Sequence, residues 1–261
     1  MKKKIETGLC ILAGGIFMVS CLWSFWLWYG YHKGDAEYDL LYSSAVSVEW
    51  TADKTVHKET GGEENESVKA EQEYLFIDFP VLQSINPEVV GWIDFPGLTV
   101  SYPVVQGENN QIYLKRTFRG EHNAAGAIFM DNRNCKDLTD QNTVIYGHNM
   151  KNGSMFGMLK RYQDETFYQD HPYFYYYTQE DIYRCDIVGI YSVQADISEY
   201  PVTFKNDEEY AGYQKKVLKR SLIKTPTEVA PADRLITLST CNNKESTRFV
   251  VQAKLNKCSN K

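Results

Sequence analysis

The pattern of hydrophobic and polar residues divides the chain into three regions. Residues 8–31 are almost entirely apolar, and their only ionisable side chains are Cys and Tyr. About 20 such residues suffice for a helix to span a bilayer, so we expect a transmembrane helix there. Residues 32–73 are charged and lack apolar periodicity, which is typical of a flexible spacer. From residue 74 to residue 261, short apolar runs alternate with turn residues, which indicates one globular domain.

Within the predicted spacer, residues 38–50 carry apolar positions. This stretch is consistent either with a short helix at the membrane surface or with part of the tether, and the sequence leaves both open.

The flanks of the apolar segment predict its orientation. Lys2, Lys3 and Lys4 precede it, and an aromatic cluster suited to the membrane interface ends it. We therefore expect residues 1–7 in the cytoplasm and the domain outside the cell, as in a single-pass protein of the cell membrane. A cleaved signal peptide is disfavoured because the run is too long and no A-x-A site follows. A lipoprotein site at Cys21 is disfavoured because apolar and aromatic residues continue after it.

The pattern after residue 74 predicts a β-rich domain with few helices. The most amphipathic helix is expected over residues 207–223, and shorter helices over 76–85 and 154–162, the latter with Ser154 as N-cap and Asp164 capping a further helix. Many short strands with few helices indicate a closed β-barrel decorated by helices. The strands are expected at residues 89–93, 98–105, 126–130, 142–146, 173–178, 182–193 and 235–240, and from 248 onwards.

Two of these strands bring a thiol and a cation together. The run over residues 235–240 delivers Cys241, and Arg248 opens the next strand after a short polar turn. Strands joined in this way are antiparallel neighbours, so Cys241 and Arg248 are expected to face each other at the end of a hairpin. A fixed positive charge favours thiolate over thiol, which predicts a reactive Cys241. The alternative is an inert buried cysteine beside a solvated arginine.

His148 is the histidine best placed to assist that cysteine. It follows a buried strand that ends in a glycine, and strand ends commonly present catalytic side chains. The alternative is a loop histidine with local hydrogen bonds. The remaining histidines fall at the membrane edge, in the spacer, in an exposed loop and before a proline, namely His32, His57, His122 and His171.

Charge and cysteine spacing narrow the function classes. The net charge is −6, whereas nucleic-acid binding favours a basic surface, so we expect no nucleic acid as partner. The six cysteines form no C-x-x-C pair and no regular spacing, so the sequence signals neither a zinc site nor a disulfide framework. The chemistry outlined above requires no metal and no other cofactor.

Three ordered motifs resemble the class B sortases, cysteine transpeptidases of Gram-positive cell surfaces. They are V-I-Y-G-H-N-M-K-N-G-S-M-F-G-M-L (144–159), L-S-T-C (238–241) and R-F-V-V (248–251). The resemblance extends over residues 75–255 and includes N-P-E-V-V-G-W-I (86–93), Y-P-V-V-Q (102–106) and G-A-I-F-M-D (126–131). The predicted helix at 207–223 is similar to the insertion that separates class B from other sortases. The resemblance implies an eight-stranded barrel with His148, Cys241 and Arg248 at one end of a groove.

The same resemblance implies a mechanism. A thiolate at Cys241 would attack a backbone carbonyl in a C-terminal sorting signal, N-P-x-T-x or related, to form a thioacyl-enzyme. Arg248 would donate hydrogen bonds to the oxyanion, and His148 would protonate the leaving amine. The incoming amine would belong to a peptidoglycan cross-bridge or its lipid-linked precursor. With ordinary pKa values of ~8.5 and ~6.5, the thiolate–imidazolium pair would make up on the order of 1% of molecules at pH 7.

Five further residues are candidates for substrate binding. Ser239 and Thr240 directly precede the nucleophile. Asn110 and Leu114, four apart and so on one face if helical, resemble groove residues of the class. Tyr213, with Tyr210, either walls the groove from the predicted helix or packs in the core.

Two other functions compete with the transpeptidase. One is a membrane-anchored cysteine peptidase that hydrolyses, but papain-like enzymes usually place Cys before His and use Asn or Asp as third member, whereas His148 here precedes Cys241. The other is a surface binding protein without enzymatic activity.

Overall fold

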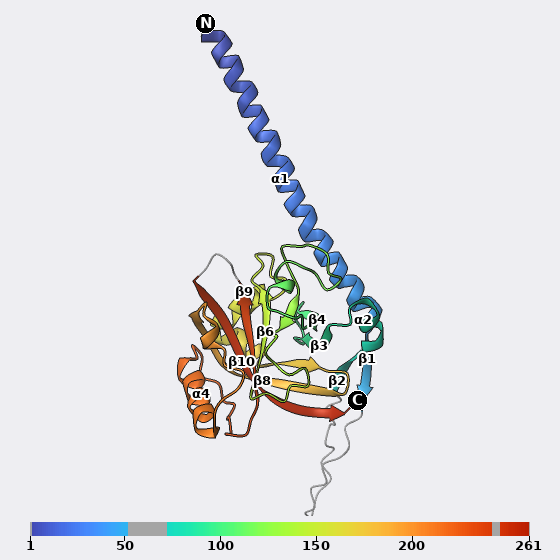
Figure 1. The fold of residues 1–261 in the computed structure, drawn as a ribbon, viewed down its shortest axis with the longest axis vertical. Helices are drawn as coiled ribbons and strands as arrows, with labels where there is room; N and C mark the ends of the chain where they lie inside the picture. The colour runs from blue at the N-terminus through green and yellow to red at the C-terminus, as the bar shows by residue number, and fades with distance from the viewer. Residues whose placement is uncertain (1, 52–71, 242–245, 261) are drawn as a thin grey trace, which may run out of the picture.

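A closed eight-stranded β-barrel forms the body of the protein (Figure 1). The computed structural model describes residues 2–51, 72–241 and 246–260. Around the barrel the strands follow the order β10-β8-β7-β3-β4-β5-β6-β9, which confirms the predicted barrel. The strands are β3 Val89–Asp94, β4 Ser101–Val105, β5 Ile128–Met130, β6 Asn142–His148, β7 Tyr173–Tyr177, β8 Asp181–Gln194, β9 Leu235–Cys241 and β10 Thr247–Asn260.

Most neighbours in the barrel are antiparallel, but β4 pairs with β5 and β6 pairs with β9 in parallel. A parallel pair requires a long crossover, and the chain between β6 and β9 supplies it. The register sets Asn142 opposite Leu235 and His148 opposite Cys241. The two strands therefore end at the same edge of the barrel. Strand β9 and its antiparallel neighbour β10 form the predicted hairpin.

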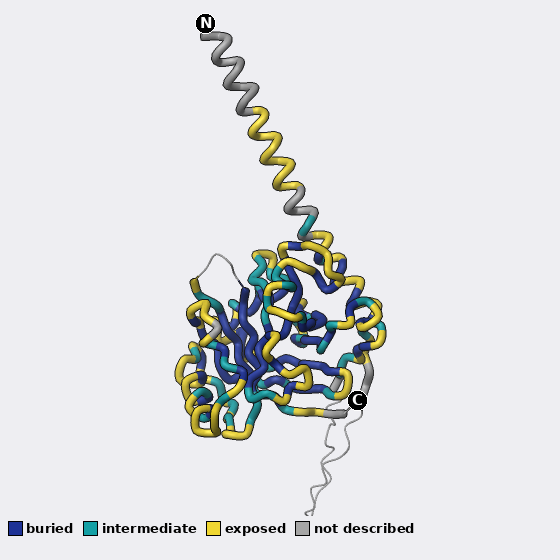
Figure 2. The backbone as a smooth tube through the Cα atoms, viewed as in Figure 1, coloured by how far each residue is buried: buried dark blue, intermediate teal, exposed yellow. Residues whose placement is uncertain are grey.

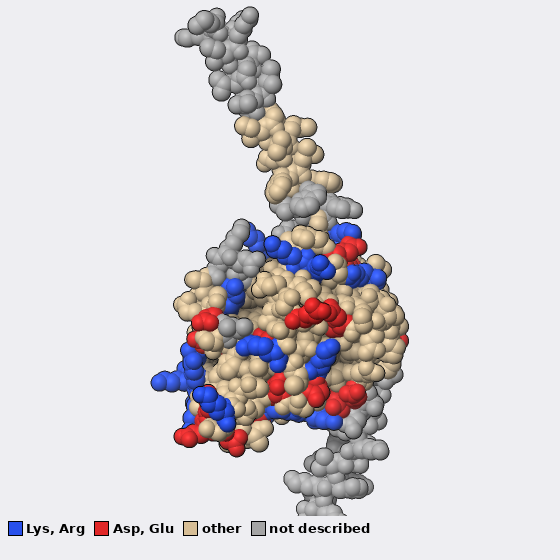
Figure 3. Space-filling view, viewed as in Figure 1, with Lys and Arg blue, Asp and Glu red and all other residues tan. Residues whose placement is uncertain are grey.

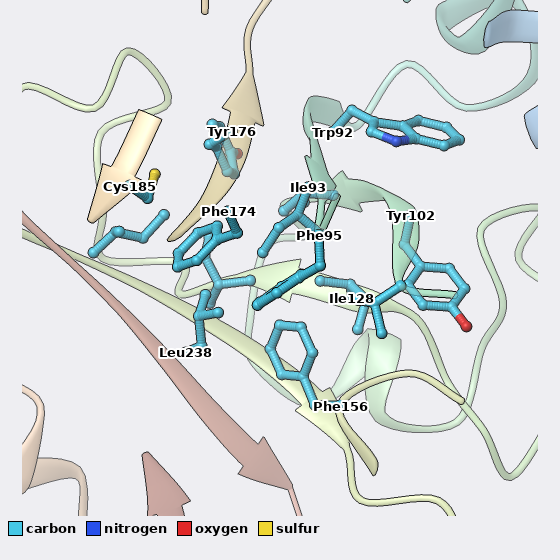
Figure 4. Close-up of a cluster of buried hydrophobic side chains, with 14 of the residues drawn as sticks. Trp92, Ile93, Phe95, Tyr102, Ile128, Phe156, Phe174, Tyr176, Cys185 and Leu238 are labelled. Carbon is cyan, nitrogen blue, oxygen red and sulfur yellow. The ribbon is translucent and has the colours of Figure 1, made fainter. Parts of the chain in front are cut away.

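Aromatic and aliphatic side chains pack together in the buried core (Figure 4). Phe95 and Phe174 stack with ring centroids 4.8 Å apart, and Phe156 is fully buried. Close packing reaches the strand that carries His148: a Cβ added at Gly147 would lie 2.5 Å from Ile128 Cδ1 and 2.7 Å from the Phe156 ring. Gly147 is therefore required for the barrel core to extend directly beneath the end of β6.

Short helices and 3-10 turns cover the barrel, and side-chain caps fix several of their ends. Asp78 accepts from Val81 N at the start of α2, Asp164 accepts from Thr166 N before α3, and Asn206 accepts from Glu209 N before α4. The helix expected over 207–223 and the cap at Asp164 are thus confirmed. The elements are α2 Phe79–Ile85, η1 Ile112–Leu114, η2 Gly157–Gln163, α3 Glu165–Asp170, η3 Ile197–Glu199 and α4 Asp207–Arg220.

Two of the shorter helices differ from expectation. The element expected over 154–162 is a 3-10 helix from Gly157, and Ser154 does not cap it. Met155 adopts a φ of 53°, which a helix cannot contain, so the helix begins only after it. The helix expected over 76–85 begins at Phe79 because the preceding residues form strand β2, Gln72–Ile77.

The predicted spacer is wrong over its first part. Helix α1, Lys2–Ala45, continues through it, and strand β1, Val46–Thr51, follows and pairs with β2. Tyr38, Leu41 and Ala45, at three- and four-residue steps, are buried against the barrel, where Ala45 O accepts from Asp78 N at 2.8 Å. Residues 38–45 are thus one helical face of the core rather than a tether. The rest of the predicted spacer, residues 52–71, lies outside the described residues.

Further towards the N-terminus, α1 leaves the barrel and its described side chains are exposed (Figure 2). Over the ranges that the structure describes, no helix has both the length and the apolar character needed to cross a membrane. The expected transmembrane helix at residues 8–31 is therefore not supported. On the face shown in Figure 3, acidic and basic side chains of the barrel are interspersed.

The packing of α1 predicts a stability difference between adjacent leucines. Leu41 is fully buried and Leu40 is 63% exposed. We expect Leu41→Ala to lower the free energy of unfolding by about 2–5 kcal/mol, because it removes buried methyl groups and leaves a cavity. Leu40→Ala should change it by less than about 0.5 kcal/mol. Urea unfolding followed by fluorescence measures both, and equal effects would contradict the packing of this segment.

Candidate active site

His148, Cys241 and Arg248 meet at one edge of the barrel. His148 ends β6, Cys241 ends β9 directly opposite it, and Arg248 lies at the start of β10. Val250 pairs with Ser239, and the same register continued by two residues sets Arg248 opposite Cys241. The predicted convergence of these residues is therefore present, from three adjacent strands.

A pocket of about 290 Å³ opens beside Cys241 and Arg248. Its walls come from the segment before β5, from β5 and β6, from the segment around η3 and from β9 and β10. The lining residues are Asn110, Gln111, Leu114, Phe129, Tyr146, Ala195, Asp196, Tyr200, Ser239, Cys241 and Arg248. A larger cleft of about 930 Å³ lies between α1 and the barrel, but no His, Cys, Lys or Arg of the described residues lines it. The smaller pocket is therefore the candidate active site.

At the candidate nucleophile, Cys241, burial affects the thiol pKa more than the nearby positive charge of Arg248 does. The side chain of Cys241 belongs to the barrel interior, with 9% of the residue exposed. Burial raises the pKa of the Cys241 thiol to about 12, although the charge of Arg248 and a hydrogen bond with the Gly147 backbone act in the opposite direction. Arg248 thus favours the thiolate as expected, but in the protein without substrate burial disfavours it more strongly.

The imidazole of His148 is held by the backbone. Burial lowers its pKa, a hydrogen bond to the Leu114 backbone raises it, and the positive charge of Arg248 lowers it further, with a net decrease. Nε2 is buried and has no hydrogen-bond partner among the described residues. The bond to the Leu114 backbone therefore helps to orient the imidazole ring.

These two shifts define the charge state of the resting site. A raised thiol pKa and a lowered imidazole pKa both favour the neutral form near pH 7. The resting pair is therefore a thiol and a neutral imidazole, and the charged pair is rarer than the ~1% that ordinary pKa values give. An arrangement of this kind suits proton transfer from the thiol to Nε2 during attack rather than a preformed thiolate.

An ion pair between the buried Asp131 and the partly exposed Arg133 supports the pocket wall. Asp131 has no exposed surface, and Arg133 binds it with Nε and Nη2 at 2.9 and 2.7 Å. Burial alone would raise the pKa of Asp131, but the hydrogen bonds from Arg133 hold it below its usual value. The Tyr146 hydroxyl donates to Asp131 at 2.9 Å, and Arg133 donates to Tyr200 O at 3.1 Å. Two tyrosines of the pocket are thus fixed by one charge pair.

A polar network below the pocket joins four strands and helix α4. Thr237 on β9 donates to Asn142 on β6 at 2.7 Å, and Gln252 on β10 donates to Thr237 at 2.7 Å and to Asn142 at 3.2 Å. Tyr191 on β8 donates to Gln252 at 2.7 Å. Tyr213 on α4 accepts from Gln252 at 3.1 Å. Because β6, β8, β9 and β10 each contribute a polar partner at the same level, this network resists slippage of one of these strands against another.

The five predicted substrate-binding residues separate into two groups. Asn110, Leu114 and Ser239 line the pocket, and Ser239 Oγ lies 2.9 Å from the Tyr200 hydroxyl. Thr240 is buried and accepts from Phe249 N, so it does not line the pocket. Tyr213 belongs to the polar network and likewise does not. Tyr210 is also in the interior, where its hydroxyl donates to Gln141 O.

The period of a β-strand would have corrected part of this prediction. Alternate residues of a strand face the same side, so Ser239 accompanies Cys241 and Thr240 points away. The same rule selects Tyr146, two residues before His148, which was not among the predicted site residues. The tyrosine at position 200 carries no such local signal, because a separate loop delivers it to the pocket.

Comparison with known proteins agrees with this geometry. Residues 93–256 match the family model described as a sortase domain. The sortase B of Listeria monocytogenes is 37% identical over 177 residues, which cover 67% of this chain and 72% of that protein. A Staphylococcus aureus sortase B–substrate complex superimposes with a TM-score of 0.68 at 34% identity, covering 70% of this chain and 86% of the other. A sortase B complexed with triglycine gives the same TM-score, identity and coverage.

The chain therefore belongs to the sortase family. Within that family it is a class B sortase, a cysteine transpeptidase that anchors proteins to the cell wall.

The raised thiol pKa predicts how Cys241 reacts with iodoacetamide. Because the thiolate is the nucleophile, its alkylation rate should rise about tenfold per unit from about pH 7 to about pH 10. Arg248→Gln should slow the reaction at each pH, since removal of the cation raises the thiol pKa further. Mass spectrometry of the Cys241 peptide measures the rate, with the exposed Cys135 as reference for the reagent. A plateau below about pH 9 would contradict the shift.

Proposed function

We propose that this enzyme cleaves a C-terminal sorting signal of the N-P-x-T-x type after Thr and transfers the protein to an amine of peptidoglycan or its lipid-linked precursor. The observation that carries the proposal is the meeting of His148, Cys241 and Arg248 at adjoining strand ends beside a pocket. Solved relatives described as a substrate complex and a triglycine complex support a peptide donor and an amine acceptor.

The first half of the reaction forms the thioacyl-enzyme. The Cys241 sulfur attacks the carbonyl carbon of the Thr residue while its proton passes to Nε2 of His148. Arg248 donates hydrogen bonds to the oxyanion that develops on the carbonyl oxygen. When the peptide bond breaks, the imidazolium returns that proton to the leaving amine. One proton thus serves both steps, and the neutral resting pair of the site already holds it.

The second half runs in reverse. The neutral acceptor amine attacks the thioester carbonyl, its proton passes to Nε2 of His148, and the C–S bond breaks as the sulfur recovers a proton from the imidazolium. The products are the new amide and the resting enzyme. Water in place of the amine gives hydrolysis, the reaction of the competing peptidase.

The proposed substrate contacts are the walls of the pocket. Asn110, Leu114 and Ser239 line it together with Tyr146 and Tyr200. Their mixed polar and apolar character suits an extended peptide, because pockets of this kind fix orientation with few polar groups. Leu114 has two functions in this scheme, since its side chain faces the pocket and its carbonyl orients His148.

The same proposal includes attachment to the cell membrane, with residues 1–7 in the cytoplasm and the barrel outside. Its support is the apolar segment at 8–31 behind three lysines. The described large apolar side chains in that segment are 61–68% exposed on α1; they are Ile16, Phe17, Met18, Val19, Leu22, Trp23 and Phe25.

Substitution of the three catalytic candidates tests the reaction. In the full chain in detergent, Cys241→Ala should abolish cleavage of a quenched N-P-x-T-x peptide. His148→Ala should lower kcat at least ~100-fold because the proton carrier is lost. Arg248→Lys should lower it roughly 100-fold because the ammonium cannot reproduce the guanidinium donors.

The controls separate the competing functions. Cys135→Ala removes an exposed cysteine and should leave the rate unchanged. Mass spectrometry with a saturating amine acceptor identifies the product, and exclusive hydrolysis would favour the peptidase. A fully active Cys241→Ala would contradict both the transpeptidase and the peptidase. A fully active Arg248→Lys would refute the assignment of the oxyanion contact.

Fractionation tests the membrane attachment. We expect the chain to remain in the membrane pellet after alkaline carbonate extraction, and the exposed Cys135 to react in intact cells with a maleimide that cannot cross membranes. A double substitution, Phe17→Lys with Val19→Lys, should move the protein out of the pellet, because each charge at mid-membrane costs about 3 kcal/mol. Unchanged extraction of both proteins into the soluble fraction would contradict the proposal.

A further inference from the structure

The C-terminal part of α1 is bonded to the segment between η1 and β5. Asn123 donates to Gly30 O at 2.8 Å, and Arg119 N donates to the carboxylate of Glu37 at 2.9 Å. The buried hydroxyl of Tyr38 donates to Gly126 O at 3.0 Å. Three contacts spread over two turns of helix therefore fasten this segment at both its middle and its end.

Gly126 lies directly against the carbonyl that orients His148. Its φ is +61°, and a Cβ added there would be 2.5 Å from Tyr113 O and 3.0 Å from Leu114 O. Next to it, Ala127 N donates to Tyr113 O at 3.0 Å. The glycine that Tyr38 holds therefore packs on the backbone of Leu114, which accepts the hydrogen bond from His148.

Tyr38 also contacts a residue that supports the loop after β6. Its ring meets Tyr102 edge-on, with centroids 5.2 Å apart, and the Tyr102 hydroxyl accepts from Met155 N at 3.3 Å. Met155 belongs to the loop that leaves β6, in which Phe156 N donates to His148 O at 2.9 Å. The segment before β5 and the loop after β6 thus flank His148. Tyr38 of α1 contacts Gly126 in the first and Tyr102, which is bonded to the second.

We propose that Tyr38 is a positioning residue for His148: it holds Gly126 against Leu114 and supports the loop after β6 through Tyr102. The inference rests on the proposed function of His148 as proton carrier. Displacement of a catalytic group lowers kcat and leaves KM unchanged, because substrate binding and proton transfer use different contacts. The end of α1 is then part of the active site, although it contributes no atom to the pocket.

Tyr38→Phe tests the inference because it removes one hydroxyl and keeps the ring. The matched control is Tyr42→Phe, the same change one turn later on the same helix, at a residue that is 40% exposed. In the full chain in detergent, Tyr38→Phe should lower kcat roughly three- to tenfold with KM unchanged. Tyr42→Phe should leave both unchanged.

A second readout follows the imidazole itself. In protein labelled with ¹⁵N-histidine, the pKa of His148 should fall in Tyr38→Phe, because the bond to Leu114 that raises it is weakened. The charged and titratable groups that face His148, Arg248 on β10 and Cys241 on β9, are the same in both variants. A variant that only loosened the fold would lower Tm without moving this pKa.

The outcomes distinguish this inference from the proposed function. If Tyr38→Phe keeps the kcat and the His148 pKa of the unmodified protein, the inference is overturned, whatever happens to Tm. If the unmodified chain processes no sorting peptide, the proposed function fails, and the pKa measurement alone still decides the positioning. Should Tyr38→Phe not fold, Tyr102→Phe removes the acceptor for Met155 N and must lower kcat with KM unchanged, or the inference is again overturned.

Discussion

The parallel pairing of β6 with β9 is the constraint on which the site depends. It joins two strands that are far apart in sequence, and its register sets His148 against Cys241. A slip by one residue would turn one of these side chains to the other face of the sheet. The buried hydrogen bonds among Asn142, Thr237 and Gln252 oppose such a slip, because a slip would leave these polar groups without partners in the core. The relative position of His148 and Cys241 is therefore maintained by buried residues below the pocket, which do not line it.

Burial of the nucleophile explains why the resting site is uncharged. Removing the Cys241 thiol from water disfavours its anion more than one nearby guanidinium favours it. The same burial disfavours the imidazolium of His148. In the proposed mechanism, Arg248 therefore stabilises charge that appears during the reaction rather than activating the resting thiol.

Local patterns predicted much of the fold, and long-range contacts account for what they missed. The hairpin of Cys241 and Arg248, the capped helix α4 and the barrel itself follow from alternation, caps and turns in neighbouring residues. The parallel pairing of β6 and β9 has no local signal, since its partners are separated by a crossover. The packing of Tyr38 and Leu41 was missed because charged residues surround them and suggest a spacer. Thr240 was misplaced because adjacency in sequence was given more weight than the two-residue period of the strand.

The continuity of α1 from Lys2 to Ala45 has a geometric consequence. A helix advances about 1.5 Å and turns about 100° with each residue. The barrel is fastened to the last turns of this helix, so its direction about the helix axis is fixed relative to the first turns. One residue added within the exposed part would rotate the pocket by about 100°, whereas seven residues, close to two full turns, would nearly restore its bearing. The number of turns in this helix thus sets the direction of the pocket, about the helix axis, relative to the first turns of α1.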